Sequence, residues 1–280
     1  MALNISGVFQ TLFDSEVKQS YQAESVLRPY VRVKPNVKGS TQKFYVIGKG
    51  TASVRTPQSD VVPIGVSYTP QTATMSDYSA AEYSDIFQAG KVNFEERQEL
   101  VQLCGKAIGR RLDQLIIAAL DAASSSLTVA NSIGGSTTNM NVAKIREAKL
   151  LLDTKNVPQE DRTLVIHADG LANLLSETSV TSSDFVNVKA LVNGQIDTFL
   201  GFKVVSLGDR DEGGLTKDGS NDRQCFAFHK ASIGLAENMT ARTEINYIPE
   251  KTSHLVNAMF SAGSTHIDAE GIVEITARES

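Results

Sequence analysis

The stretch between residues 42 and 70 contains two β-prone runs that have no obvious partner nearby. The first run is Phe44 to Ile47, and the second alternates apolar residues with small or polar ones at Ile64, Val66 and Tyr68. A ribbon of only two strands is marginally stable in water and needs a third strand or a surface to pack on. The sequence that follows is turn-like and then helical. The fold must therefore provide a surface that the neighbouring sequence does not offer.

Charge is distributed unevenly along the chain. The net charge of −5 disfavours a dedicated nucleic-acid binder, which usually carries a basic excess. Residues 1–55 nevertheless contain eight Lys or Arg against three acidic residues, and residues 56–100 contain seven acidic residues against Lys91 and Arg97. The basic front of one copy could dock on the acidic segment of another copy. A solvated surface on which charges happen to cluster is the alternative.

The composition is typical of a soluble globular protein, with 41% hydrophobic and 21% charged residues among 280. The longest apolar run, Leu115 to Leu120, is too short to span a bilayer, which takes about 20 residues. The first residues lack the features of a signal peptide. Two cysteines, Cys104 and Cys225, do not make a disulfide framework, so folding in a reducing compartment is expected.

A long helix is predicted from Asn93 to Leu120. Asn93 and Glu96 have capping-box spacing, and an apolar stripe that includes Cys104 follows the helical period. Charged residues, among them Asp113, fall elsewhere around the helical wheel. At 1.5 Å per residue the helix would be roughly 40 Å long, which suggests that it braces something extended.

The remaining pattern predicts an α+β fold. A second helix is expected at 142–154, a strand at 162–167 and a short helix at 168–177. Hairpin character follows at 192–209, a charged surface loop at 209–223, and then strand-like runs at 225–229, 241–248, 254–263 and 271–278.

No stretch of the sequence makes a convincing catalytic, cofactor or metal site. Gly48 and Gly50 follow a strand but precede more strand-like sequence, whereas a phosphate loop opens a helix. The loop at Asp209 and Asp211 departs from a calcium loop at two ligand positions. The four histidines lack metal-type spacing. Asp169, at a strand end entering a helix, is expected to be a cap or turn residue, and Cys104 a core thiol. The protein is therefore not expected to be an enzyme.

The order of the predicted parts resembles the major capsid proteins of tailed bacteriophages, which have the Hong Kong 97-like fold, and the short-tailed podophage members in particular. The resemblance is carried by KNVPQEDRTLVIHADGLANLLSE (155–177), by GQIDTFLGFKVVSLGD (194–209), and by the closing region from Cys225 to Ile275. It implies an N-terminal arm (1–38), an extended β-hairpin loop or E-loop (39–78), a peripheral domain (79–136 and 239–280) with a spine helix at 93–120, and an α/β axial domain (137–238).

The resemblance further implies a structural subunit of an icosahedral phage head, which self-assembles into pentamers and hexamers. Portal and scaffolding proteins would be partners, a decoration protein is a further possible one, and packaged double-stranded DNA would be contacted only non-specifically. The shell would be assembled in the host bacterial cytoplasm and would have no membrane partner. The residues expected at subunit contacts are Lys43, Lys49, Arg55, Tyr68, Asp77, Glu82 and Asp85.

Three other interpretations remain open. An encapsulin-type nanocompartment shell shares the same fold. An α/β hydrolytic enzyme and a phage tail or adhesion protein belong to different classes.

Overall fold

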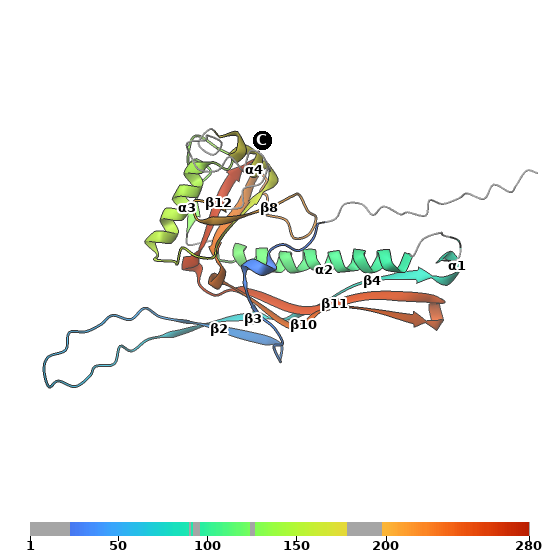
Figure 1. Cartoon of the computed structure of the whole chain (residues 1–280), viewed down its shortest axis with the longest axis horizontal. Coiled ribbons are helices and arrows are strands. Elements are labelled where there is room, and N and C mark those ends of the chain that lie inside the picture. The colour runs from blue at the N-terminus through green and yellow to red at the C-terminus, as the bar shows by residue number, and fades with distance from the viewer. Residues whose placement is uncertain (1–22, 90, 92–95, 124–126, 178–197, 280) are drawn as a thin grey trace, which may run out of the picture. The chain divides into compact units, whose positions relative to one another are not determined.

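A computed structural model describes residues 23–89, 91, 96–123, 127–177 and 198–279 (Figure 1). The chain divides into two compact units. Within the described residues, unit 1 contains 78–108 and 241–260, and unit 2 contains 23–77, 109–240 and 261–279. The fold is a mixture of helices and mostly antiparallel sheets, as the α+β pattern predicts. None of the helices in the described part of the chain is long and apolar enough to cross a membrane.

The core of unit 2 is a six-stranded sheet in the order β5-β12-β9-β6-β8-β7. Its strands are β5 (Thr128–Val129), β6 (Arg162–His167), β7 (Thr198–Phe199), β8 (Phe202–Leu207), β9 (Asp222–His229) and β12 (Ile272–Arg278). All six residues of β6 are buried, and β6 pairs in parallel with β8 and antiparallel with β9. Helix α3 (Val142–Thr154) packs on β12 and β5, and α4 (Ala168–Ser176) packs on β6 and β8. The centre of this sheet is covered, whereas Lys203 and Ser206 on β8 remain exposed.

The sequence predicts these elements closely. Helix α3 matches its expected bounds, with Ile145, Ala148 and Leu152 buried as the periodicity requires. Strand β6 and helix α4 occur where they are expected. The hairpin is present as β7 and β8, while its earlier residues up to 197 lie outside the described part.

A second sheet has the strand order β1-β10-β11-β4. Its strands are β1 (Arg32–Lys34), β4 (Ser76–Asp85), β10 (Ile233–Ile248) and β11 (Ser253–His266). Strand β1 pairs in parallel with the start of β10, with Arg32 opposite Gly234. Strands β1 and β4 of this sheet are not predicted: the sequence suggests an irregular arm at the position of β1 and a turn at the position of β4. Strand β5 of the large sheet is not predicted either.

Unit 1 contains short aromatic contacts on its strands and connections. The rings of Tyr78 and Phe260 stack with centroids 5.1 Å apart, and the Lys251 ammonium lies 4.0 Å from the centre of the Tyr83 ring. Cys104, in the part of α2 (Glu96–Asp121) that belongs to this unit, is buried. Burial raises the pKa of its thiol, which confirms the expected core thiol. The predicted cap Asn93 lies outside the described residues.

Two expectations about polar residues are wrong. Asp113 does not lie on a polar face of α2 but is completely buried, because its position falls among the buried Leu112, Ile116 and Ile117. The loop at 209–223 is not simply a solvated surface: Leu215, Asp222 and Arg223 are buried, and ion pairs with Asp113 and Glu279 hold the loop to the body of unit 2.

A third sheet consists of two strands only, β2 (Thr41–Ile47) and β3 (Tyr68–Thr74), in antiparallel register with Ile47 opposite Tyr68. The sequence predicts a ribbon here and places its first strand correctly, but it places the second strand too early: Ile64 and Val66 lie in the loop, and β3 begins only at Tyr68. Its end approaches β11 so closely that a Cβ on Gly263 would lie 2.1 Å from the Thr74 carbonyl oxygen. Only glycine allows that approach.

Candidate subunit-interface surface

The β2–β3 ribbon has two chemically different faces, which follow from the two-residue period of a strand. Phe44 on β2 and Ala73 on β3 are buried. They pack with Val37, Ala236 and Ile267 in a small hydrophobic cluster of unit 2. Gly234 leaves room for the Phe44 ring, which would lie 2.8 Å from any Cβ at that position. The inner face of the ribbon is therefore anchored to its own subunit.

The outer face of the same ribbon is exposed to solvent and is not covered by other parts of the described chain. Cross-strand register places Lys43 opposite Thr72, Tyr45 opposite Pro70, and Ile47 opposite Tyr68 on this face. Tyr45, Ile47 and Tyr68 remain 58%, 59% and 63% exposed. Aromatic and β-branched pairs of this kind stabilise a sheet when a further layer covers them.

The loop between the two strands continues the exposed apolar surface. In Figure 1 the chain between β2 and β3 runs on beyond their paired ends as a long loop. It exposes Val54, Val61, Val62, Ile64 and Val66, and Val54 is 97% exposed. Large exposed apolar stretches on soluble proteins mark interaction sites. We call the outer face of the ribbon (Lys43, Tyr45, Ile47, Tyr68, Pro70, Thr72) together with loop 48–67 the ribbon surface.

An ion-pair cluster fixes the root of this loop. The Lys49 Nζ donates to Glu270 Oε2 at 2.7 Å, and Lys155 Nζ donates to Glu270 Oε1 at 3.2 Å. These two bonds hold the pKa of Glu270 below its ordinary value, and the bond to Glu270 raises the pKa of Lys49. All three side chains are well exposed to solvent, so the cluster orients the loop more than it stabilises the fold.

The seven residues expected at subunit contacts lie in different surroundings. Lys43 and Tyr68 share the ribbon surface, and Arg55 is exposed on its loop. Lys49 already has a partner in its own chain. Asp77 and Glu82 are exposed on β4, whereas Asp85 accepts a hydrogen bond from Phe87 N at 2.7 Å at the start of α1 (Ile86–Ala89). Lys43 and Tyr68 thus lie on one face of the ribbon, opposite Thr72 and Ile47 respectively, and the expected roles of all seven residues stay predictions.

Sequence reasoning missed the buried polar anchor at Asp113. Its carboxylate accepts hydrogen bonds from Ser25 Oγ (2.9 Å), Val26 N (3.1 Å) and Leu27 N (3.2 Å), and pairs with Arg210 at 3.0 Å. One side chain on α2 therefore fixes both the N-terminal segment and the 209–213 loop. The only sequence signal was its place between buried helical positions.

A second missed cluster surrounds Glu279. Its carboxylate pairs with Arg223 at 2.7 Å and Lys217 at 2.8 Å, and lies 2.8 Å from Nδ1 of His167. Burial alone would raise the pKa of Glu279, but the hydrogen bonds from Arg223 and Lys217 outweigh it and lower the pKa to about 2. The Arg223 guanidinium also reaches Asp209 at 2.7 Å. This cluster joins β12 to the loop before β9.

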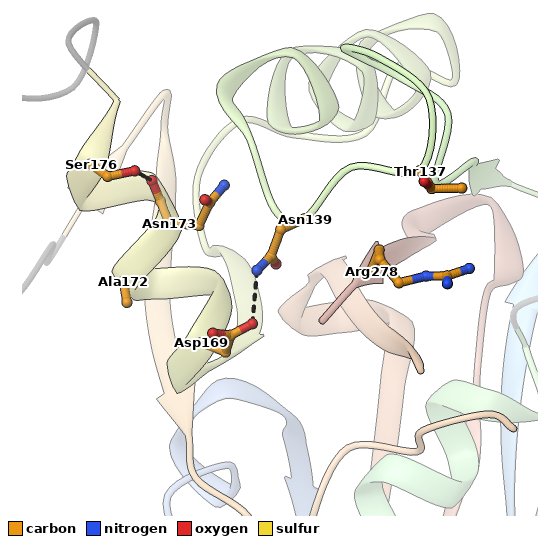
Figure 2. A pocket seen from close by; sticks show the side chains of 7 residues that line it. All are labelled: Thr137, Asn139, Asp169, Ala172, Asn173, Ser176 and Arg278. Carbon is orange, nitrogen blue, oxygen red and sulfur yellow. Dashed lines mark hydrogen bonds between the residues drawn. The ribbon is translucent and has the colours of Figure 1, made fainter. Parts of the chain in front are cut away.

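A polar hollow of about 490 Å³ lies between α4 and the end of β12 (Figure 2). Asn139 donates to Asp169 at 2.7 Å and Ser176 donates to the Asn173 carbonyl at 2.6 Å, so its polar groups largely satisfy one another. Asp169 lies in the first turn of α4 as expected, although the capping group is His167, which accepts from Asp169 N. Across the part of the chain that the structure describes, no three His, Cys, Asp or Glu side chains are grouped to hold a metal ion.

A comparison with protein families matches this sequence, over residues 5–279, to the family described as phage capsid protein. The chain therefore belongs to the phage capsid protein family. This family consists of structural, non-enzymatic proteins, in agreement with the expectation that the chain is not an enzyme.

Solved phage structures have the same fold. The capsid structure of cyanophage P-SCSP1u shares 15% identity and a TM-score of 0.79, covering 100% of this chain and 97% of its own. A structure from Mycobacterium phage Che8 shares 18% identity and a TM-score of 0.74, covering 98% of each chain. The head structure of Helicobacter pylori bacteriophage KHP40 is 11% identical, with a TM-score of 0.76, and the match covers 100% of this chain and 99% of that one. A search of curated proteins by sequence gave no match.

Proposed function

We propose that this chain is the shell-forming subunit of an icosahedral phage head, with the Hong Kong 97-like fold, and that it assembles into pentamers and hexamers around double-stranded DNA. The observation that carries the proposal is the ribbon surface: its inner face is anchored on Phe44 and Ala73, while its outer face is apolar and uncovered. A second copy of the chain provides the missing layer. Membership of the capsid family and the head and capsid structures of similar fold support this occupant.

The same proposal assigns a role in the capsid fold to each part of the chain. Residues 39–78 are the E-loop, α2 is the spine helix of a peripheral domain, and the six-stranded sheet is the core of an axial domain. Strand β12 pairs with β9 along its length, so we assign residues 272–278 to the axial domain and end the peripheral domain before them. A scaffolding protein, a portal and, where present, a decoration protein act in trans, and the finished shell is part of the virion.

Charge should set the register between copies. Lys43, Lys49 and Arg55 of one copy meet acidic residues of the 77–99 segment of a neighbour. Many modest contacts of this kind allow errors to be corrected during assembly and still hold the shell collectively.

Electron microscopy of the purified protein tests the proposal directly. Closed shells tens of nanometres across are expected, and discrete small oligomers would contradict it. DNA inside shells recovered from infected cells supports a phage head, whereas enclosed host protein would indicate an encapsulin instead.

A charge reversal tests the pairing. Lys49→Glu combined with Arg55→Glu should block or misdirect assembly while the subunit remains folded by circular dichroism. Glu270→Gln is the matched control, because it removes the partner of Lys49 within the chain but keeps every basic residue; shells should form. Normal shells from the double variant would refute the pairing.

A further inference from the structure

A second hollow of unit 2, of about 560 Å³, is lined by basic groups from two distant parts of the sequence. Arg28 and Arg32 come from the N-terminal segment, in η1 (Arg28–Tyr30) and β1. His229 and Lys230 come from the start of η2 (Lys230–Ser232). The parallel β1–β10 pairing brings these two segments together. The volume lies within the usual range of ligand pockets, about 300–1,000 Å³.

The carboxylates at this hollow already have cationic partners. Glu237 is buried and binds Arg28 through Nε at 2.8 Å and through Nη2 at 2.9 Å. This two-point contact fixes the guanidinium plane at the rim. Asp161 binds Lys203 at 3.1 Å and accepts a backbone hydrogen bond from Lys230 N through its carbonyl oxygen. Glu237 thus lies behind Arg28 and does not line the hollow, whereas Asp161 lines it and is bonded to Lys203 while Lys230 acts on it only electrostatically, without a hydrogen bond.

Donors remain available in the hollow. Among the described residues, the side chains of Arg32 and Lys230 are exposed and make no hydrogen bond or salt bridge, although Lys230 lies near enough to the Asp161 carboxylate to act on it electrostatically. Nδ1 of His229 accepts from Ala231 N at 3.2 Å, which places the proton of the neutral ring on Nε2. Burial lowers the pKa of His229 and keeps the ring neutral at neutral pH. A guanidinium, an ammonium and an imidazole N–H therefore share one hollow.

This set of donors fits a phosphate group better than a carboxylate. A phosphodiester offers several oxygen acceptors around one centre, and Arg and Lys together are its usual protein partners. The surrounding sequence agrees: between Glu24 and Asp60 the chain contains seven Lys or Arg and no acidic residue. Such a stretch in a protein with a net charge of −5 marks a local footprint for a polyanion.

We propose that the hollow formed by Arg28, Arg32, His229 and Lys230 binds backbone phosphates of double-stranded DNA. Contacts of this kind carry no base information, so binding is independent of sequence. The inference deepens the proposed function, on which it rests for the source of the DNA. With only Arg32 and Lys230 outside any salt bridge, the site is weak at physiological salt, so that DNA can move past it.

The test measures binding of a random-sequence duplex to the full-length protein across a range of salt concentrations. Arg32→Gln combined with Lys230→Gln should weaken binding roughly tenfold at low salt. It should also reduce the slope of log K against log salt by about 1.8, because each phosphate that is no longer neutralised accounts for about 0.9. Inorganic phosphate at millimolar concentration should compete with the duplex for the wild-type protein only.

Lys91→Gln combined with Arg146→Gln is the matched control, because it removes the same charge from exposed positions that do not line the hollow. An equal loss of binding in the control would overturn the site, and so would unchanged binding in the Arg32 and Lys230 variant. Shell formation is scored in parallel by electron microscopy. If the variant binds DNA normally but fails to form shells, the hollow takes a carboxylate of a second copy, and the phosphate proposal is wrong while the capsid proposal stands.

Discussion

The β2–β3 ribbon and the β6–β9 region of the large sheet both consist of extended chain, yet they are completed in opposite ways. Every residue of β6 is buried, between paired strands and under α4. On β2 the burial alternates, and only Phe44 is fully covered. The large sheet is finished within one chain, whereas the ribbon is finished on one face only. An incomplete sheet can therefore be held in place when its inner face is anchored on a hydrophobic cluster, even though its outer face remains exposed.

The largest expected effect contrasts two aromatic truncations. Phe226→Ala removes a completely buried ring from β9 and should lower the free energy of unfolding by about 3–5 kcal/mol. Tyr68→Ala removes an exposed ring from the ribbon surface and should change it by less than about 0.5 kcal/mol. Urea unfolding of unassembled subunits measures both. Only the Tyr68 variant should then fold normally and fail in assembly; a large stability loss from Tyr68→Ala would break the comparison.

The next effect concerns Asp113, the buried anchor of unit 2. Asp113→Asn leaves Arg210 without its carboxylate and at least one backbone N–H without an acceptor, so a loss of about 3 kcal/mol is expected. Hydrogen exchange should show faster exchange at Val26 and Leu27. Asp161→Asn, which breaks an exposed ion pair with Lys203, is the control, and its unfolding midpoint should be the same as that of the wild type within error.

A smaller effect depends on pH and on Glu279. Its pKa in the folded protein, about 2, lies below that of the unfolded chain, so the stabilisation is present above about pH 4.5 and is lost as the pH falls toward 2. About 2 kcal/mol should disappear across that window. Glu279→Gln removes this pH dependence, while Glu212→Gln, in a more exposed pair with Arg111, retains it. Equal acid sensitivity in both variants would show that the stabilisation lies elsewhere.

The smallest effect is expected at the root of the loop. Lys49→Gln breaks an exposed ion pair with Glu270, and the unfolding midpoint should not move measurably. Differential scanning calorimetry of the subunit checks this. A drop of several degrees would mean that the loop root is part of the subunit's core, and the contrast between ribbon and sheet would need revision.

The elements that could be predicted are those whose signal is local. The ribbon, α3, β6 and α4 show clear periodicity in side chains that pack close by. Strand β4 does not: its sequence, SDYSAAEYSD, is rich in Ser and Ala, and it is extended because it pairs in a sheet with β11. Strand β1 likewise exists through its parallel pairing with residues 234–236. Pairings across such separations leave no trace in a window of sequence.

The candidate surface was predictable in part for the same reason. The sequence indicates two β-prone runs without a partner, and the alternation that ends at Tyr68 places this residue on an apolar face. The partners of individual charges depend on the tertiary fold. Asp113 looks like an ordinary polar helix residue until the N-terminal segment reaches it, and the pairing of Lys49 with Glu270 joins positions 221 residues apart. Sequence periodicity predicts which face a side chain occupies but not which charge it meets.

The pairing of β1 with β10 also fixes an order of events during synthesis. Arg28 and Glu237 are 209 residues apart in the sequence, so their ion pair cannot form until β10 has been translated, whereas Asp113 can bind Ser25, Val26 and Leu27 earlier. Strand β1 pairs only after β10 has left the ribosome, and a prematurely terminated chain that lacks β10 leaves β1 and the Arg28 side chain unpaired. A paired β1 therefore marks a chain that has been translated at least through the start of β10.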